Sequence, residues 1–381
     1  MLQNVMAIPS PLTVAQLIPA LDSGGAERCV VDVARAVVEA GHRSLVISAG
    51  GRLISELRAG GSEHLTRQIG RKSPMMLREV LWLRSLLTTE RIDLLDVHSR
   101  VPAWVAWLAL SMRAGQPRPA LVTTVHGLNR PGRYSRIMTR GDVVIAVSES
   151  VRTFLQTHYA GLSSNRVTVI PRGVDVETFP PRMQVDSEWR ERFFQQFPEC
   201  RERQLLTVVG RLSRGKGHGD LLHLLSRLSR RGQPVHGLCV GALEGRGDYV
   251  RELQSMARQL GVADRVSFLG IRSDLSQIYA ISSVVLSLSV KPESFGLVVA
   301  EALSMGRPVV GYAHGGVADQ LEVSYPEGVI TPGDLQQLED CVSAILAGRI
   351  GPPTASQVVR TSEMTEKTVV VYEQLVRRRC P

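Results

Sequence analysis

The regular alternation of short apolar runs with amphipathic helical stretches constrains the fold more than any other feature of this sequence. In the first half, the runs that predict strands are 13–19, 44–48, 64–69, 93–97, 120–125, 142–147 and 166–170. Strands that alternate with helices of about 10–15 residues predict a parallel sheet covered by helices on both faces. The first half is therefore expected to be a doubly wound α/β domain.

The same pattern begins again after "PRGVDVETFPPR" (171–182), a segment rich in proline and turn-forming residues. The strands predicted beyond it are 205–209, 236–240, 265–269, 284–288, 308–312 and 328–331. A chain of 381 residues is also too long for one ordinary core. We therefore expect two domains, 1–171 and 172–360, followed by a helix within 361–381 that begins with Thr or Ser and ends in arginines.

Composition excludes several classes of protein. With 44% hydrophobic and 21% charged residues, the chain is neither disordered nor fibrous. The longest apolar stretch, 101–112, is too short to span a bilayer, and the N-terminus lacks a secretory signal. A cytoplasmic location is expected. The five cysteines are scattered without a C-x-x-C pair, so the sequence predicts neither a disulfide framework nor a metal site.

The positive charge is concentrated in the first half. Residues 1–171 hold 20 Arg and Lys against 12 Asp and Glu, a net +8, whereas the whole chain carries +9. This asymmetry predicts an anionic partner for the first domain, such as an anionic membrane surface or a phosphorylated saccharide, and nothing indicates nucleic acid. If 130–140 is helical, four arginines share one face, while four further cations flank "MMLREVLWL"; solvated side chains are the alternative for both sets, which are Arg130, Arg133, Arg136, Arg140, Arg71, Lys72, Arg78 and Arg84.

Candidate site residues of the first domain follow its predicted strands. Gly24 and Gly25 open a helix after the first strand, where glycines allow close approach of a ligand or serve packing alone. The dinucleotide fingerprint G-x-G-x-x-G is missing there. His98 and His126 also follow strands, and either is a satisfied structural residue or a site residue.

The second domain shows a similar arrangement. Arg211 and Lys216 follow a strand among glycines, a pairing that suits a diphosphate, although the spacing is not that of a Walker A loop. Glu293 follows the strand 284–288, and a helix is predicted over Phe295–Met305. Amides at the start of that helix would favour an anion, and Glu301 lies about two turns further on.

Together these segments resemble the retaining glycosyltransferases of family 4, which have the GT-B fold. The resemblance rests on "SGGAE", "VHG", "IAVSES", "VIPRGVD", "GRLSRGKG", the E-x7-E of "ESFGLVVAE" and "GRPVVGYAHGG", which span almost the whole chain. It implies two Rossmann-like domains facing across a cleft, with the closing helix returning to the N-terminal domain. No metal or cofactor is implied beyond the nucleotide-diphosphate sugar itself.

The resemblance also implies residue roles. Arg211 and Lys216 would neutralise the diphosphate, Glu293 would meet donor-sugar hydroxyls and Glu301 the ribose, while His126 would lie against the reacting sugar. The remaining positions are assigned to donor binding (Gly24, Gly25, Ser294, Phe295, Gly296 and Leu297) and to acceptor binding (His98, Arg130 and Arg133). Three positions depart from the common pattern and put substrate identity in question: Arg172 where Asn is usual, Ser294 where Gly is frequent, and Ala318-Asp319 where Pro-Glu is common.

The expected function is retaining transfer of a hexose or N-acetylhexosamine from a UDP-sugar, with GDP-mannose as another donor, to a lipid-linked saccharide such as lipopolysaccharide core. Retention could use a carboxylate nucleophile and a covalent intermediate, but the resemblance implies front-face attack by the acceptor, with the leaving phosphate taking the proton. Work on such an acceptor would place the protein peripherally at the inner face of the cytoplasmic membrane. A nucleotide-sugar epimerase, a phosphorylase, or a catalytically silent binding subunit of the same fold are the alternatives.

Overall fold

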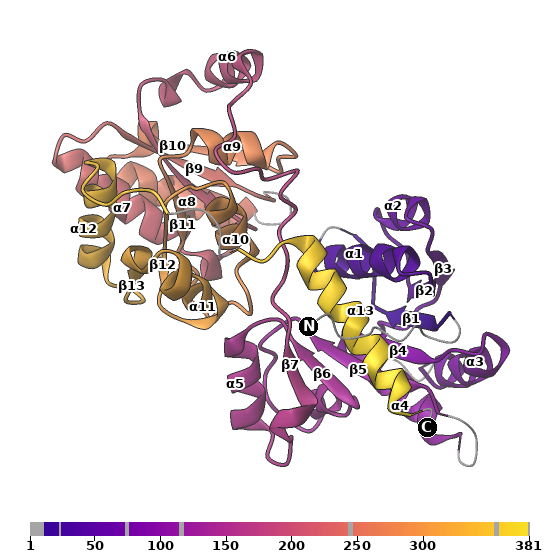
Figure 1. Ribbon diagram of the computed structural model, residues 1–381. Coiled ribbons are helices and arrows are strands. Elements are labelled where there is room, and N and C mark those ends of the chain that lie inside the picture. The colour runs from indigo at the N-terminus through magenta and orange to yellow at the C-terminus, as the bar shows by residue number, and fades with distance from the viewer. Residues whose placement is uncertain are drawn as a thin grey trace, which may run out of the picture. The chain divides into compact units, whose positions relative to one another are not determined.

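The computed structural model describes residues 11–22, 24–72, 76–113, 118–242, 247–353 and 358–379. The chain divides into two compact units (Figure 1): the first runs to Gly173 and resumes at Thr361, and the second spans Val174–Arg360. The division falls two residues after the expected boundary at 171. The C-terminal helix α13 (Thr361–Arg377) belongs to the first unit.

The first unit is built on a parallel sheet in the order β3-β2-β1-β4-β5-β6-β7. Its strands are β1 (Thr13–Leu17), β2 (Arg43–Ser48), β3 (Glu63–Thr66), β4 (Leu94–Val97), β5 (Ala120–Val125), β6 (Val143–Ala146) and β7 (Val167–Val169). Its other helices are α1 (Gly25–Glu39), α2 (Ile54–Ala59), α3 (Met76–Thr89), α4 (Arg100–Ser111) and α5 (Glu149–His158), with 3₁₀ turns η1 (Ser135–Thr139) and η2 (Ser164–Arg166). Each strand predicted for this half is confirmed.

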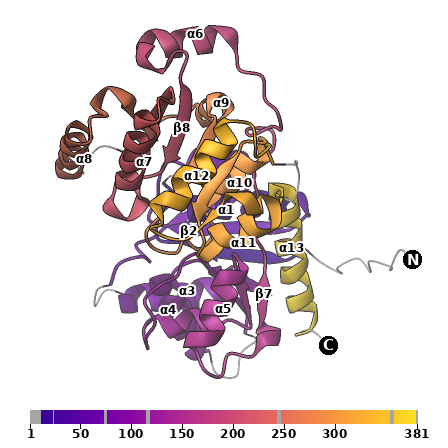
Figure 2. The ribbon, with the colours of Figure 1, turned by 90° about the vertical axis from the view of Figure 1, so that its left-hand side faces the viewer.

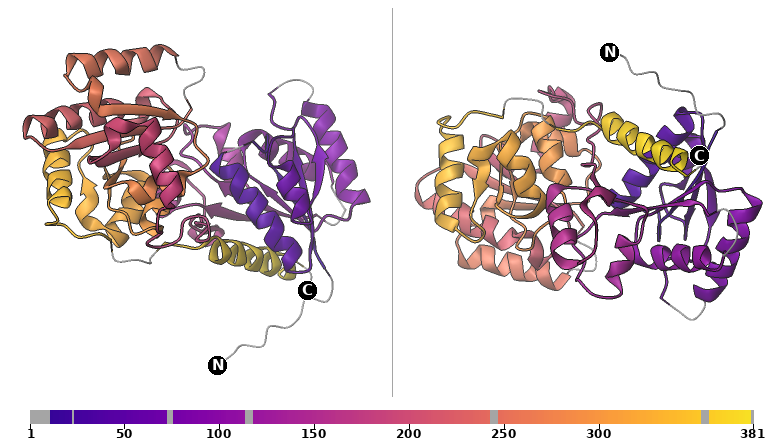
Figure 3. Two further views of the ribbon diagram at one scale, coloured as in Figure 1. Left: turned by 90° about the horizontal axis from the view of Figure 1, so that it is seen from above. Right: turned by 60° about the horizontal axis from the view of Figure 1, so that its bottom comes forward.

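Helix α13 packs against α1 and β5, so the end of the chain completes the first unit (Figures 1 and 3). Its buried side chains recur at helical spacing and are Met364, Thr365, Thr368, Val369, Tyr372 and Leu375. The central strands β4 and β5 are buried along their whole length, which is why they read as continuous apolar runs. All strands being parallel, their carboxyl ends meet at one edge of the sheet, where the candidate site lies.

The second unit contains a parallel sheet in the order β10-β9-β8-β11-β12-β13. Its strands are β8 (Gln204–Val209), β9 (Val235–Val240), β10 (Val266–Gly270), β11 (Val284–Ser287), β12 (Val309–Tyr312) and β13 (Val329–Ile330). Its helices are α6 (Ser187–Gln196), α7 (His218–Arg230), α8 (Gly247–Gln259), α9 (Leu275–Ile281), α10 (Leu297–Ser304), α11 (Gly315–Ser324) and α12 (Leu335–Leu346), with 3₁₀ turns η3 (Pro198–Cys200), η4 (Arg214–Lys216), η5 (Ala263–Arg265) and η6 (Pro326–Gly328). Helix α7 packs between α8 and α12 (Figure 2), and the strands predicted for this half are confirmed.

One helix prediction and one conditional expectation need correction. The helix expected over Phe295–Met305 begins only at Leu297, because Gly296 has a left-handed backbone (φ 86°) and serves as the N-cap. The segment 130–140 is not a continuous helix: only the 3₁₀ turn Ser135–Thr139 forms, since Pro131 and Gly132 interrupt its start. Its arginines therefore share no helical face, although all four are exposed.

Candidate functional site

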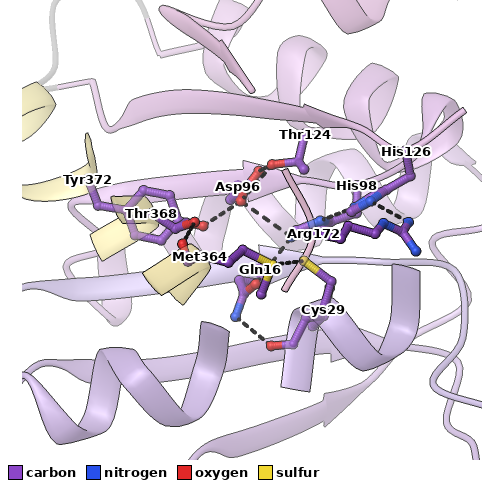
Figure 4. Close-up of polar contacts among 11 residues, drawn as sticks. Gln16, Cys29, Asp96, His98, Thr124, His126, Arg172, Met364, Thr368 and Tyr372 are labelled. Carbon is purple, nitrogen blue, oxygen red and sulfur yellow. Dashed lines mark hydrogen bonds and ion pairs between the residues drawn. The ribbon is translucent and has the colours of Figure 1, made fainter. Parts of the chain in front are cut away.

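A line of buried polar side chains crosses the carboxyl ends of the central strands in the first unit (Figure 4). Gln16 in β1 and Asp96 in β4 are fully buried, and His98, just after β4, is 6% exposed. His126 follows β5, and its Nε2 lies 2.9 Å from Nδ1 of His98. The structure thus brings together the two histidines that the sequence predicted at this edge, with their rings stacked at 5.2 Å.

Within this line each group donates a hydrogen bond to the next, in the order Arg172, His126, His98 and Gln16. Gln16 Nε2 donates to the carbonyl of Val30 (3.2 Å), so its Oε1 is the atom that faces His98 Nε2 at 3.2 Å. His98 must then carry its proton on Nε2, which leaves its Nδ1 to accept from His126 Nε2–H. His126 Nδ1 in turn accepts from the guanidinium of Arg172 at 2.9 Å. Every ring nitrogen of the pair is therefore engaged.

Electrostatics keep both rings neutral. Burial lowers the pKa of His98 below its ordinary value, and the Arg172 charge lowers it further, while Asp96 offsets part of the shift. Burial and then Arg172 hold the pKa of His126 well below its ordinary value. Neutral imidazoles with one donor and one acceptor nitrogen are what the directed chain requires.

Asp96 lies at the end of this hydrogen-bonded line that is opposite to Arg172. Its carboxylate accepts hydrogen bonds from Thr124 Oγ1 (2.9 and 3.0 Å) and from the hydroxyl of Tyr372 in α13, and it lies 3.4 Å from His98 Nε2. Burial and the adjacent carboxylate raise the pKa of Tyr372 well above its usual range. A buried carboxylate is tolerated because each of these donors satisfies one of its lone pairs.

Arg172 is half-buried at the carboxyl end of β7 and contacts His126 through one terminal nitrogen. Its Nε is buried without an acceptor among the described residues. Burial lowers the pKa of its guanidinium, and Glu27 offsets only part of that effect. Within the described part of the chain Arg172 forms no salt bridge, so its charge is held in place but not neutralised.

The other candidates of the first unit are less closely gathered. Gly24 is the N-cap of α1 and Gly25 its first residue, and the carboxylate of Glu27 lies against Gly24. The first turns of α1 approach Arg172, since Cys29 and Arg172 line one small cavity. Arg130 and Arg133 are exposed on the segment after β5, and the structure gives them no contact with His98.

In the second unit, Lys216 and Glu293 meet at the carboxyl edge of the sheet. Lys216 lies after β8 and Glu293 after β11, and Lys216 Nζ is 2.6 Å from Glu293 Oε1. Ser289 donates its hydroxyl to the same carboxylate oxygen. Both charged side chains remain partly exposed, at 29% and 25%, so the pair is open to a ligand.

Glycines allow the loops that carry this pair to pack on one another. Gly217 has a left-handed backbone (φ 72°), and a Cβ there would overlap the carbonyl of Leu288. Gly315 (φ 63°) lies against the backbone of Glu293, and the amide of Gly316 donates to the Glu293 carbonyl at 2.7 Å. The glycines of both loops therefore fix the position of Lys216 and Glu293 through backbone packing.

The segment between Glu293 and α10 is held from α11. Gln320 Nε2 donates to the carbonyls of Phe295 and Gly296, the latter at 3.3 Å. Phe295 is 6% exposed and packs into the core, whereas Ser294 and Leu297 are half-buried. Arg211 is exposed, directly after the sheet.

Glu301 lies on α10 and is half-buried. Its Oε2 accepts a hydrogen bond from the fully buried Tyr279 at 2.8 Å. Burial raises the pKa of Glu301 to about 7, and the Tyr279 hydroxyl limits that rise. Near neutral pH this carboxyl therefore exists in both protonation states.

Some site residues were not predicted from the sequence. No sequence motif marks Asp96, Gln16 or Tyr372. A polar residue within a predicted buried strand, such as Gln16 or Asp96, nevertheless indicates a functional site. His314 follows β12 beside Glu293, where burial lowers its pKa and Glu293 offsets part of the shift. Its place in "YAHGG" directly after a strand is the signal that would have found it.

One group of possible metal ligands among the described residues lies at the opposite edge of the second sheet: Glu199, Cys200 and His236. Ser267 connects two of them, accepting from His236 Nε2 at 2.9 Å and donating to Glu199 at 2.7 Å. Burial raises the pKa of the Cys200 thiol to about 12, so it is not a thiolate. A hydrogen-bonded network accounts for this group.

Comparison with known proteins agrees with both units. The model of Glycosyltransferase Family 4 matches residues 23–178, and that of glycosyl transferases group 1 matches residues 189–362. A D-inositol 3-phosphate glycosyltransferase of Xylanimonas cellulosilytica is 31% identical over 75% of this chain and 73% of that protein. A GDP-mannose-dependent α-(1-6)-phosphatidylinositol monomannoside mannosyltransferase of Mycobacterium tuberculosis is 27% identical over 56% of this chain and 55% of that protein.

Solved structures share the fold. A glycosyltransferase of Rickettsia africae aligns with a TM-score of 0.83 at 25% identity, over 96% of this chain and 99% of that one. HepE of Anabaena, in complex with UDP and glucose, aligns with a TM-score of 0.79 at 24% identity, over 95% and 99%. The chain therefore belongs to the family 4 glycosyltransferases, and its two parallel-sheet units are those of the GT-B fold.

Proposed function

We propose that this glycosyltransferase binds a nucleotide-diphosphate sugar in its second unit and transfers the sugar, with retention, to an anionic acceptor bound by its first unit. The observation that carries the proposal is the pair Lys216–Glu293, 2.6 Å apart and partly exposed at the carboxyl edge of the second sheet. Ligands of doubly wound sheets bind at this edge, and the pair offers both a cation and a hydrogen-bond acceptor there.

The reaction requires positive charge where the diphosphate departs. Lys216 supplies a mobile ammonium and Arg211, exposed nearby in the chain, supplies a planar fork for phosphate oxygens. The amides at the start of α10 add partial positive charge. Fixed charges of this kind lower the barrier as negative charge builds on the leaving group. Glu293 is assigned to the hydroxyls of the donor sugar.

Proton transfer is assigned to the substrate rather than to a histidine. Both ring nitrogens of His126 are engaged, by His98 and by Arg172, so this ring has no free site to take the acceptor's proton. We therefore keep front-face attack, in which the leaving phosphate takes the proton. A covalent intermediate on a carboxylate is the alternative route to retention.

The donor and acceptor are proposed by chemical class. UDP-sugars are favoured by the likeness to HepE, and GDP-mannose by the mycobacterial relative. The names of both curated relatives specify phosphorylated acceptors, one an inositol phosphate and one a phosphatidylinositol mannoside. We accordingly widen the expected acceptor from lipopolysaccharide core to phosphorylated or lipid-linked saccharides and polyols. An epimerase, a phosphorylase or a silent binding subunit would lack such transfer.

Lys216→Gln tests the donor site. Because one cation at the developing charge is lost, kcat/KM with a verified donor is expected to fall roughly 10²–10³-fold. Lys367→Gln, an exposed lysine on α13, removes the same charge elsewhere and should leave kcat/KM unchanged. Wild-type kinetics for Lys216→Gln, with an unaltered melting temperature, would remove the diphosphate role. Absence of any sugar transfer by the wild type would favour the silent subunit.

Affinity for the nucleoside diphosphate should depend on pH through Glu301. With a pKa of about 7, its carboxylate is mostly ionised at pH 8 and mostly neutral at pH 6. If the ionised form accepts the ribose hydroxyls, affinity falls about tenfold between these pH values, as the competent fraction falls. Calorimetric titration measures it, with Glu301→Gln as the control that should lack the step. An equal step in both proteins would assign it to the phosphate of the ligand instead.

We also propose that the exposed face of α3 binds an anionic bilayer. Leu77 and Leu81 are 59% and 48% exposed, and four exposed cations lie near them in the sequence, namely Arg71, Lys72, Arg78 and Arg84. Exposed apolar side chains accompanied by cations are typical of surfaces that bind anionic lipid. No helix in the described part of the chain is long and apolar enough to cross a membrane.

Vesicle co-sedimentation checks this face. Binding should require anionic lipid, weaken toward about 0.5 M salt as charges are screened, and drop severalfold in Arg78→Gln/Arg84→Gln. The matched control is Arg190→Gln/Arg192→Gln, two exposed arginines of α6 in the second unit. Equal binding to neutral vesicles, or equal loss in the control, would refute the assignment.

A further inference from the structure

We propose that Arg172 is an anion-binding residue of the first unit, aimed by the chain of His126, His98 and Asp96, and that it holds the phosphate of the acceptor. Naming the ligand as the acceptor rests on the proposed function. The binding of a phosphate at Arg172 does not depend on it.

The first step is the state of the Arg172 guanidinium. One terminal nitrogen is fixed on His126 Nδ1 at 2.9 Å, while Nε is buried with no acceptor among the described residues. A buried donor without a partner costs free energy, and more so on a charged group. Because Nε is enclosed and Arg172 as a whole is half-buried, an oxygen acceptor of a ligand would reach the guanidinium through its terminal nitrogens.

The second step is the charge balance around Arg172. Glu27 acts on Arg172 electrostatically, yet the two form no ion pair, and Glu27 lies against Gly24 at the start of its own helix. Asp96 lines the same small cavity as Arg172, but its carboxylate accepts from Thr124 and Tyr372 and forms no ion pair with Arg172. Cys29, also close, is a buried thiol whose pKa is raised to about 12, so it adds no negative charge at neutral pH. The guanidinium therefore keeps a net attraction for an anion.

The third step is how the fork is aimed. Because His126 presents an unprotonated Nδ1, it accepts from Arg172 and fixes one edge of the guanidinium. That tautomer depends on His98, whose own tautomer depends on Gln16 and Asp96 (Figure 4). His126, His98 and Asp96 are thus positioning residues, and Arg172 is the residue that contacts the ligand.

The chemistry of a planar fork specifies the ligand. Guanidinium binds phosphate or carboxylate through two parallel hydrogen bonds, which a single lysine charge or an asparagine does not reproduce. The position lies at the carboxyl edge of the first sheet, in the half that carries +8 of the chain's +9 charge. A phosphate monoester, free or on a lipid, is the ligand class that fits both observations.

The experiment uses the full chain with Arg211→Gln/Lys216→Gln as the parent, so that the cations of the donor site do not bind the probe. Calorimetric titration with glycerol 3-phosphate tests the soluble source. Co-sedimentation with vesicles containing phosphatidic acid, in a parent that also carries Arg78→Gln/Arg84→Gln so that the α3 face does not bind the bilayer, tests the lipid source. Adding Arg172→Gln should weaken binding about tenfold or more in at least one arm, the scale expected for a charged hydrogen-bonded pair. Adding Arg192→Gln instead, at an exposed arginine of the second unit, should leave the binding of glycerol 3-phosphate and of the vesicles unchanged.

Arg172→Lys keeps the charge and guards against a variant that merely fails to fold. It should bind glycerol 3-phosphate or the vesicles more tightly than Arg172→Gln and less tightly than the parent. Equal affinity of the parent and both variants in both arms, or no phosphate binding by the parent at all, would overturn the proposal. A failure of nucleotide-sugar binding would leave these outcomes unaffected, so the two hypotheses are separable.

Discussion

The first unit depends on one buried carboxylate, that of Asp96. It accepts hydrogen bonds from Thr124 in the neighbouring strand and from Tyr372 in the C-terminal helix, and it contacts His98. These partners come from 28 and 276 residues away for Thr124 and Tyr372, so a single group joins distant parts of the chain. Removing a hydrogen-bond donor from a buried charge typically costs about 1.5–3 kcal/mol, so loss of the Thr124 or Tyr372 hydroxyl would destabilise the first unit.

The two units hold their charges by different means. In the first unit, two neutral imidazoles lie between the anionic Asp96 and the cationic Arg172. Protein groups supply nearly every hydrogen-bond partner of these side chains. In the second, Lys216 and Glu293 are partly exposed and are held by glycine-rich loops whose backbones touch. A solvated pair exchanges its partner for a ligand at low cost, whereas a buried chain keeps its geometry. This contrast suits a mobile diphosphate on one unit and a fixed anion subsite on the other.

The sequence predicted those features that depend on local residue patterns. Strand runs followed by polar residues located His98, His126, Lys216 and Glu293, because parallel strands bring their carboxyl ends to one edge. Contacts between residues distant in the sequence could not be predicted from it. No local pattern indicates that Arg172 contacts His126, 46 residues away, or that Glu301 contacts Tyr279. The arginines of 130–140 would have shared a face only in a helix, and the Pro131-Gly132 step interrupts one there.

The central claim is that hydrogen bonds run in one direction from Arg172 through His126 and His98 to Gln16, beside the carboxylate of Asp96. Nitrogen-15 spectra of the imidazoles, assigned with His98→Gln and His126→Gln, measure which ring nitrogen carries the proton. The structure predicts that both rings are neutral at neutral pH with the proton on Nε2, since burial lowers both pKa values. A proton on Nδ1 of either ring, or an imidazolium at neutral pH, would contradict the account.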